Sequence, residues 1–362
     1  MVKILFFIPQ LVGGGAERVT VNIIKMLDKN FFDIHLVVTT TKFSVYENLP
    51  EDITLHDLKI LKTSASIFAL RKLIKRLDPD MLFSSLLRGH IAISIALMGS
   101  RKRPFLIFRS PNSPKLLIKY KQISRIENFF LEYAYKTADV ILAQTPEMKD
   151  EIIQYHKVKV DKVKVLINPI DSSLINEKIK HIENPFNPNN INVVASGRIV
   201  YQKGFDILIQ SFKYVVDQNP LYKLYIIGGG AAEEVKALKK LVDTFGLFEH
   251  VFFLGFQDNP YKYYYFSDLY VLSSRWEGLP NTVLENLYLQ KPIVSTRCIP
   301  YMETLISERK NGLLVNVEDV DALAEAVLNY KSITCEFIET VSIEKRVNDF
   351  FKVIKEESYY EY

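Results

Sequence analysis

Two glutamates, Glu277 and Glu285, flank a short run of glycine, proline and small polar residues in the second half of the chain. The residues that follow the first glutamate are Gly278, Leu279, Pro280, Asn281 and Thr282. The apolar stretch 268–274 before them predicts a buried parallel strand. After them we expect a helix over about 283–289, capped by the asparagine or the threonine. The first backbone N–H groups of such a helix point past the carboxyl edge of the sheet, where they can bind a diphosphate.

Carboxylates beside an anion site do not suit phosphate, but they suit sugar hydroxyls, which donate hydrogen bonds to them. The stretch therefore predicts a site for a molecule that has both phosphates and many hydroxyls, and a nucleotide sugar fits this description. The alternative is an ordinary buried strand–helix unit in which both glutamates are solvated.

A second polar cluster follows a predicted strand at 191–196. Gly197 frees the turn after this strand, and Arg198 and Lys203 place two cations at the mouth of the sheet. A guanidinium can bind two phosphate oxygens at once, whereas an ammonium acts as a point charge. Taken alone, the two residues could also be solvated loop cations.

The segment 277–285, Glu-Gly-Leu-Pro-Asn-Thr-Val-Leu-Glu, resembles the donor signature of the retaining glycosyltransferases of family four, which have the GT-B fold. Two further segments carry the same resemblance. Residues 197–206 are similar to the part of this family that holds the donor diphosphate. Gly-Gly-Ala-Glu-Arg-Val at 14–19 resembles its N-terminal loop, although these glycines could also form a tight packing turn.

The resemblance implies an α/β protein with two Rossmann-like, doubly wound parallel-sheet domains that face each other across a cleft. Alternating predicted strands and helices agree with such sheets. Residues 1–170 would bind the acceptor and residues 171–341 the donor. A C-terminal helix over about 342–362 would cross back onto the first domain. The polar, turn-rich spacer at 184–190 marks the link between the two domains.

By the same resemblance, the catalytic residues are Glu277, Arg198 and Lys203. The glutamate would bind hydroxyls of the transferred sugar, and the two cations would stabilise the charge that develops on the leaving diphosphate. A three-glycine turn at 228–230 would lie beside the nucleotide, and Glu285 would bind the ribose. The donor-binding residues are Gly14, Gly15, Gly197, Gly228, Phe256, Gly278, Leu279, Pro280, Asn281, Thr282 and Glu285.

Acceptor-binding residues are expected where Arg88 and Arg109 follow predicted strands, because open α/β sheets bind ligands past the carboxyl ends of their strands. Together with the N-terminal loop, this gives the predicted set Glu17, Arg18, Arg88, His90, Arg109 and Asn112. Related enzymes carry Arg-Asn or His-Asn where this chain has Arg-Ser-Pro-Asn, and a histidine at a helix start is more often structural than catalytic. The glycines at 13–15 are not a dinucleotide fingerprint, because Arg18 stands where a small residue is needed.

Charge is distributed unevenly between the two halves. Residues 1–168 carry 26 Lys and Arg against 16 Asp and Glu, a net charge of +10, whereas residues 169–362 carry 20 against 26, a net charge of −6. The bases are dispersed and no nucleic-acid motif accompanies them, so nucleic acid is not expected as a partner. An anionic membrane surface explains the asymmetry better. The basic, amphipathic segments 68–77 and 115–135 could lie on it, or could be helices with solvated lysines and an ordinary core side.

The sequence predicts neither a metal site nor a cofactor. The two cysteines form no disulfide framework or ligand set, and no Asp-x-Asp lies in a loop where it could hold an ion against a diphosphate. With no apparent signal peptide and no apolar run long enough to cross a bilayer, we expect a cytoplasmic protein that is peripheral on the inner face of the plasma membrane.

The expected function is transfer of a hexose or N-acetylhexosamine, with retention, from a nucleotide-diphosphate sugar to a lipid-linked saccharide. UDP is favoured by its frequency in the family, and the pathway would be lipopolysaccharide, O-antigen or capsule biosynthesis. Three alternatives remain open: a nucleotide-sugar 2-epimerase of the same fold, a glycosyltransferase with a soluble acceptor, and a non-catalytic binding module. A Rossmann dehydrogenase is the least favoured.

Overall fold

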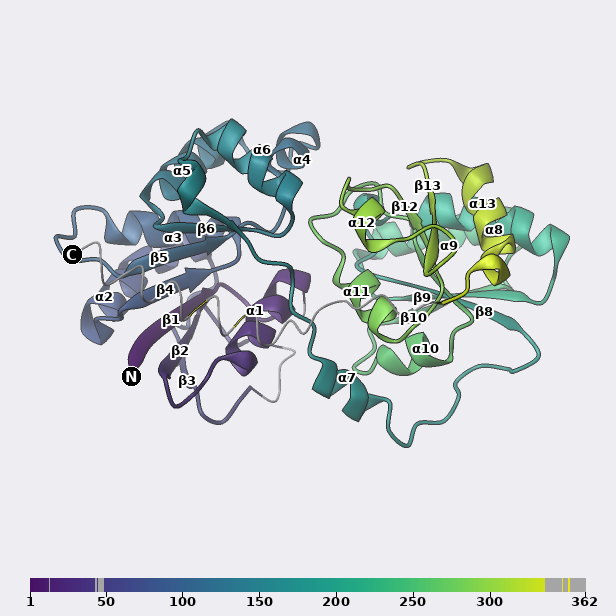
Figure 1. The fold of residues 1–362 in the computed structure, drawn as a ribbon, viewed down its shortest axis with the longest axis horizontal. Coiled ribbons are helices and arrows are strands. Elements are labelled where there is room, and N and C mark those ends of the chain that lie inside the picture. The colour runs from purple at the N-terminus through teal and green to yellow at the C-terminus, as the bar shows by residue number, and fades with distance from the viewer. Residues whose placement is uncertain (13, 43, 45–48, 336–346, 348–350, 352–362) are drawn as a thin grey trace. The chain divides into compact units, whose positions relative to one another are not determined.

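The computed structural model of the chain describes residues 1–12, 14–42, 44, 49–335, 347 and 351. The chain forms two compact units (Figure 1). Unit 1 comprises Met1–Ile170 together with the chain from Ser342, and unit 2 comprises Asp171–Val341. Each unit has its own parallel sheet, so the predicted α/β class with two doubly wound sheets is confirmed. No helix in the described part of the chain has both the length and the apolar composition that spanning a bilayer requires.

Unit 1 contains a seven-stranded sheet in the order β3-β2-β1-β4-β5-β6-β7. In β1, every residue but Lys3 is buried, as a strand covered on both faces requires. The order reverses between β1 and β4, which is where open α/β sheets bind ligands. The strands are β1 (Val2–Ile8), β2 (Phe32–Val38), β3 (Thr54–Asp57), β4 (Met81–Ser84), β5 (Phe105–Arg109), β6 (Val140–Ala143) and β7 (Val163–Val165).

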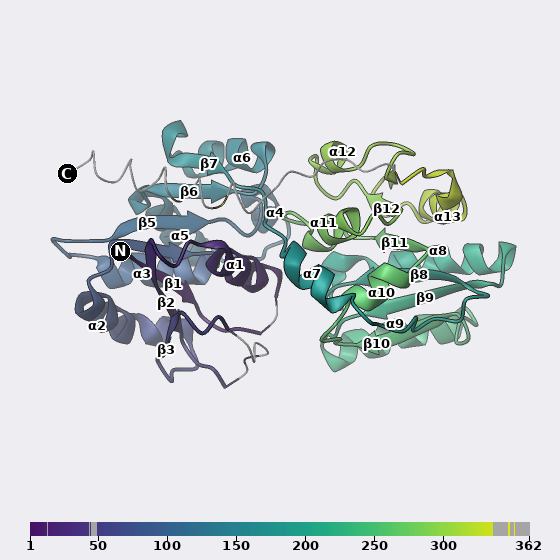
Figure 2. The same ribbon diagram turned by 60° about the horizontal axis from the view of Figure 1, so that its bottom comes forward.

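Helices pack on both faces of this sheet (Figure 2). The helix α1 (Gly15–Met26) contributes to the core on one face, where Phe351 lies 6.2 Å from Phe83 between ring centroids and Val347 is also buried. The remainder of the predicted helix over about 342–362 lies outside the described residues. The core on the other face includes residues from α2 (Ile67–Leu77), α3 (Leu87–Leu97), α5 (Arg125–Thr137) and α6 (Pro146–His156).

Unit 2 contains a six-stranded parallel sheet in the order β10-β9-β8-β11-β12-β13. Here the order reverses between β8 and β11. The strands are β8 (Ile191–Ser196), β9 (Tyr222–Ile227), β10 (Val251–Gly255), β11 (Leu269–Leu272), β12 (Ile293–Thr296) and β13 (Gly312–Val315). The helices are α7 (Ser172–Lys178), α8 (Phe205–Gln218), α9 (Ala232–Thr244), α10 (Tyr261–Phe266), α11 (Asn281–Tyr288), α12 (Met302–Leu305) and α13 (Val320–Leu328).

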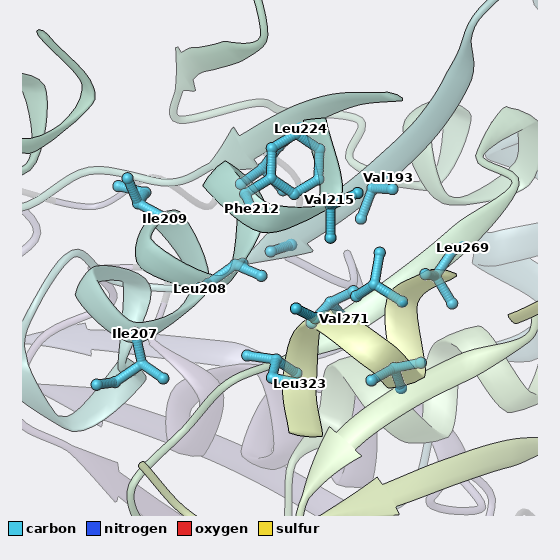
Figure 3. Close-up of a cluster of buried hydrophobic side chains, with 14 of the residues drawn as sticks. Val193, Ile207, Leu208, Ile209, Phe212, Val215, Leu224, Leu269, Val271 and Leu323 are labelled. Atoms are coloured by element: carbon cyan, nitrogen blue, oxygen red, sulfur yellow. The ribbon is translucent and has the colours of Figure 1, made fainter. Parts of the chain in front are cut away.

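The main apolar core of unit 2 lies between the sheet and the helices α8, α9 and α13 (Figure 3). Leu208 and Phe212 of α8 meet Leu224 of β9, Val271 of β11 and Leu323 of α13 in this cluster, and none of the five exposes more than 1% of its surface. Apolar residues at helical spacing on α8 produce this packing, which fixes the start of α8 beside the ends of the strands.

Two predictions of local structure are wrong. Helix α11 begins at Asn281, with Pro280 in the N-cap position and no side-chain cap, so the helix starts earlier than the polar residues indicated. The segment 115–135 is not one helix but two, α4 (Pro114–Lys119) and α5. Lys121 has a φ of 49°, which breaks the first helix, and Ser124 begins the second with a capping box.

Candidate functional site

Two loops meet at the carboxyl edge of the unit 2 sheet, where β8 and β11 are neighbours. One loop follows β8 and contains the short 3-10 helix Tyr201–Lys203, and the other follows β11. The amide of Arg275 donates to the carbonyl of Gln202 at 2.8 Å. The Ser273 hydroxyl donates to the carbonyl of Lys203 at 2.9 Å. These hydrogen bonds join the two loops directly. They link residues shortly before Glu277 in one loop to Gln202 and Lys203 in the other.

Lys203 and Glu277 form an ion pair at the junction of these loops. Lys203 Nζ lies 2.7 Å from Glu277 Oε1, and the two side chains expose only 18% and 10% of their surface. The Ser274 hydroxyl donates to the same carboxylate oxygen at 2.6 Å. Gln202 Nε2 donates to the carbonyl of Trp276 at 2.9 Å and lies 3.4 Å from Glu277 Oε2. The structure thus brings together the ammonium and the first carboxylate of the predicted donor site.

Two glycines allow backbone segments to approach closely at this edge: Gly204 where the loops after β8 and β11 meet, and Gly228, after β9, beside the turn that follows β8. Gly204 has a φ of +61°, and a Cβ built on it would lie 2.1 Å from the carbonyl oxygen of Ser273. Gly228 has a φ of +131°, and its Cβ would lie 2.0 Å from the carbonyl oxygen of Gly197. Any other residue would push the two backbones apart. Gly197 itself leaves space for the stem of Lys203, since a Cβ there would lie 2.8 Å from Lys203 Cε.

Arg198 is held at the same edge by the backbone on either side of it. Gly197 donates to the carbonyl of Ile227 at 2.9 Å, and Ile199 donates to the carbonyl of Gly229 at 2.7 Å. The Arg198 side chain is exposed and has no hydrogen bond or ion pair with any residue that the structure describes. Its guanidinium is therefore accessible to an anion.

Glu285 is buried on α11. Its charge and that of Glu277 both act on the hydroxyl of Tyr270. Burial raises the pKa of the Tyr270 hydroxyl, and both carboxylates raise it further, so both act on one buried group. Tyr270 lies 3.1 Å from Ser196 Oγ, which also shares a 2.7 Å hydrogen bond with Tyr264. Tyr264 is therefore a core residue, whereas the neighbouring Tyr265 is 43% exposed.

The other predicted donor residues lie on segments around this edge. Asn281 and Thr282 are the first two residues of α11, after the loop that contains Gly278, Leu279 and Pro280. Phe256 is exposed and follows Gly255, whose carbonyl accepts from the amide of Gly228 at 2.8 Å. Gly14 and Gly15, also predicted as donor residues, belong to unit 1, where they start α1.

The predicted acceptor residues of unit 1 occupy several environments. Arg109 and His90 lie in the core with at most 2% exposed surface, so neither side chain presents a surface to an acceptor in this structure. Arg88 is exposed and forms a 3.0 Å ion pair with Glu127. Glu17 is buried in the first turn of α1, and Arg18 follows it. The backbone carbonyl of Asn112 accepts from the Ser110 hydroxyl at 2.9 Å.

Arg109 is held by neutral groups rather than by a carboxylate. Its Nη2 donates to the side-chain oxygen of Asn168, and Asn168 donates to Gln144 Oε1 at 3.1 Å. Gln144 donates to the carbonyls of Ser110 and Pro111, each at 2.8 Å. Burial lowers the pKa of Arg109 to about 9. The buried guanidinium is therefore bonded to an amide oxygen, which Gln144 positions in turn, and to no carboxylate among the described residues.

His90 is neutral in this environment. Its ring stacks on Phe108 with centroids 4.7 Å apart, and Nε2 lies 3.0 Å from the carbonyl oxygen of Ser84. Burial lowers the pKa of His90 to about 3, with a smaller contribution from the charge of Arg109. The placement agrees with the structural alternative that the sequence left open.

Three residues of the unit 2 site had no predicted role: Gln202 and Ser274, which hydrogen-bond to Glu277, and Arg275, which is buried beside them. Their only sequence signal is position: Gln202 lies within the segment 197–206, and Ser274 and Arg275 stand three and two residues before Glu277. An arginine at the end of a strand in a phosphate-binding sheet is first interpreted as an anion ligand. The structure instead pairs Arg275 with Asp206 and Glu318.

Comparisons with known proteins identify the family. Residues 13–174 match the family described as Glycosyltransferase Family 4, and residues 176–336 match Glycosyl transferases group 1. The uncharacterized glycosyltransferase MJ1059 of Methanocaldococcus jannaschii is 31% identical over 301 residues, which cover 76% of this chain and 71% of the relative.

A second relative and a solved structure extend these matches to almost the whole chain. The relative is the GalNAc-alpha-(1->4)-GalNAc-alpha-(1->3)-diNAcBac-PP-undecaprenol alpha-1,4-N-acetyl-D-galactosaminyltransferase of Campylobacter jejuni, 29% identical over 376 residues, which cover 99% of this chain and 97% of the relative. The structure of Anabaena Alr3699/HepE in complex with UDP-glucose has a TM-score of 0.78 at 18% identity, covers 98% of this chain and 100% of that chain, and shares its GT-B fold. The chain belongs to the group 1, family 4 glycosyltransferases.

Proposed function

We propose that this glycosyltransferase moves a hexose or N-acetylhexosamine, with retention, from a nucleotide-diphosphate sugar to a lipid-linked saccharide of a surface polysaccharide. The observation that carries the proposal is the largely buried Lys203–Glu277 pair at the same edge of the sheet as the exposed side chain of Arg198. This edge of the sheet offers positive charge for a diphosphate and a carboxylate for sugar hydroxyls. UDP is the favoured nucleotide, which the UDP-glucose bound to the Anabaena structure supports.

In the proposed reaction, the bond between the anomeric carbon and the diphosphate oxygen breaks, and a bond to the acceptor oxygen forms on the same face of the sugar. Arg198, Lys203 and the first backbone amides of α11 stabilise the negative charge that develops on the departing diphosphate. The departing phosphate oxygen takes the acceptor proton. Glu277 holds hydroxyls of the transferred sugar, and Glu285 holds the ribose. Side-chain cations supply the positive charge, so neither a metal ion nor a cofactor takes part.

The lipid-linked acceptor and a peripheral position on the inner face of the plasma membrane are supported by two observations. The Campylobacter jejuni relative is named for a substrate on undecaprenol diphosphate. In unit 1, Ile126 and Phe129 at the start of α5 are 72% and 67% exposed, and Lys119, Lys121 and Arg125 are exposed around them. Apolar side chains among cations suit the surface of an anionic bilayer.

The test is transfer from UDP-GlcNAc, UDP-GalNAc or UDP-glucose, with EDTA present, to a polyprenyl-diphosphate-linked saccharide in anionic vesicles. We expect a product one sugar longer whose new linkage, assigned by NMR, keeps the anomeric configuration of the donor. The melting temperature should also rise with the correct donor and without a divalent ion. Interconversion of a UDP-sugar in the absence of acceptor would instead identify an epimerase. Transfer to a soluble sugar alone would contradict the lipid-linked acceptor.

A further inference from the structure

We propose that Arg275 is a positioning residue for sugar transfer: it holds the loop that carries Lys203 against the loop that carries Glu277. Among the described residues, the Arg275 side chain bonds to Asp206, Glu318 and Tyr201 rather than to Lys203 or Glu277, so it acts through the backbone and through its own partners. The inference rests on the proposed function, because Lys203 and Glu277 matter for transfer only if the donor binds there.

The Arg275 side chain, which is only 5% exposed, forms two ion pairs with elements that come from different parts of unit 2. Its Nη1 and Nη2 donate to the two carboxylate oxygens of Asp206, at 2.8 and 2.7 Å. Its Nε donates to Glu318 Oε1 at 2.8 Å. Asp206 lies in the first turn of α8, and Glu318 lies between β13 and α13. One guanidinium therefore joins the end of β11 to the starts of two helices.

Arg275 also fixes the residues immediately before Lys203. Its Nη1 donates to the carbonyl of Tyr201 at 2.7 Å, and its guanidinium carbon lies 3.8 Å from the centroid of the Tyr201 ring. Its backbone amide donates to the carbonyl of Gln202. The turn that presents the Lys203 ammonium is thus held by Arg275 from the side chain and from the main chain.

This geometry requires an arginine. A planar guanidinium can bind one carboxylate with two parallel hydrogen bonds, bond a second carboxylate through Nε, and stack on an aromatic ring at the same time, whereas an ammonium cannot. The hydrogen bonds to Asp206 raise the pKa of Arg275, so the guanidinium stays charged. Lys203 is a compact charge on a flexible stem, so its position depends on the turn that carries it.

The experiment is a double-mutant cycle between Arg275→Lys and Lys203→Met in the full chain, measured as kcat/KM for the donor well below the melting temperature. We expect Arg275→Lys to remain folded and to lower kcat/KM by about 10- to 100-fold, because a small misplacement of a charged group has effects of this size. The double variant should be no worse than Lys203→Met alone, because a misplaced residue cannot matter once it has been removed.

The control is Lys213→Met, which removes an exposed ion pair with Asp217 on α8 and should leave kcat/KM unchanged. Asp206→Asn provides a second variant. It keeps the shape of the side chain but weakens the paired hydrogen bonds with Arg275, so it should also lower kcat/KM. If the losses of Arg275→Lys and Lys203→Met simply multiply, or if Arg275→Lys lowers only the melting temperature, the positioning role is wrong. A wild-type protein that neither binds UDP nor transfers sugar would overturn the proposed function as well.

Discussion

The carboxyl edges of the two sheets contain different kinds of buried polar group. In unit 2, opposite charges are in contact: Lys203 pairs with Glu277, and Arg275 pairs with Asp206. In unit 1, the buried guanidinium of Arg109 is bonded to the neutral amide of Asn168. The nearby His90 is neutral because burial lowers its pKa. Similar folds therefore place contacts between opposite charges in one unit and a guanidinium bonded to a neutral amide in the other.

The difference indicates what each edge can do. An ammonium and a carboxylate that are already paired can each accept a new partner when a ligand brings phosphates and hydroxyls. The Arg109 network, whose acceptors are amide oxygens, offers no such exchange, because leaving one of its buried groups without a partner has a cost in stability. We therefore expect substitutions in unit 2 to alter transfer more than stability, and substitutions in the unit 1 network to do the reverse.

Glu277→Gln should have the largest effect on transfer. The amide keeps the shape of the side chain but removes the charge that binds sugar hydroxyls and pairs with Lys203, so we expect kcat to fall about 100- to 1000-fold. The measurement is kcat at saturating donor. Glu303→Gln, which weakens an ion pair with Arg297 at a more exposed site, is the matched control. A change of less than about twofold for Glu277→Gln would contradict the role assigned to it.

Acid should destabilise unit 1 through its buried histidines. Burial lowers the pKa of His90 to about 3 and that of His156 to about 4, whereas the unfolded chain titrates near 6.5. Below about pH 6.5 the unfolded state takes up protons that the folded state does not. The free energy of unfolding therefore falls by about 1.4 kcal/mol per pH unit for each histidine until its folded pKa is reached.

His156→Phe tests this expectation, because both ring nitrogens of His156 lack partners among the described residues and its ring packs edge-on against Tyr135. In urea unfolding, the variant should lose about 2 kcal/mol less than the wild type between pH 7 and pH 5. The exposed His181 of unit 2, changed to Asn, should leave the pH dependence as it is. An unchanged slope for His156→Phe would show that His156 does not cause the acid sensitivity.

A pair of hydrogen-bond deletions compares the two edges directly. Asn168→Ala removes the partner of Arg109 and should lower the free energy of unfolding by about 1–3 kcal/mol. Ser274→Ala removes one of the bonds to Glu277, and should lower kcat several-fold with a smaller effect on unfolding. Unfolding in urea and kcat are measured for both variants. The comparison fails if Ser274→Ala is the less active and also the less stable of the two.

The smallest expected effect concerns the basic surface of unit 1. Lys119→Gln and Arg125→Gln should each weaken binding to anionic vesicles at low salt by about 1 kcal/mol, or roughly fivefold. High salt should remove the difference, because it screens exposed charges. Lys213→Gln, an exposed lysine of unit 2, is the control and should bind as the wild type does. Equal effects for all three would mean that unit 1 has no special role at the membrane.

Much of the fold follows from local patterns in the sequence. The apolar run at 191–196 predicts a strand, and β8 has the same limits. This strand belongs to the second sheet, which forms from the strands and helices that follow the polar spacer. The boundaries that failed were decided by backbone conformation: the positive φ of Lys121 divides α4 from α5, and Pro280 occupies the N-cap of α11 where a polar cap was expected.

For the site, residue types and spacing alone indicated phosphate and hydroxyl chemistry around Glu277 and Lys203. Only the tertiary structure shows that these two residues are in contact and that Arg275 joins segments far apart in the chain. It also places His90 and Arg109 inside the core. The physical reason is that chemical type and local conformation are properties of short segments. Pairing and burial, in contrast, depend on which strand ends become neighbours when the sheet forms.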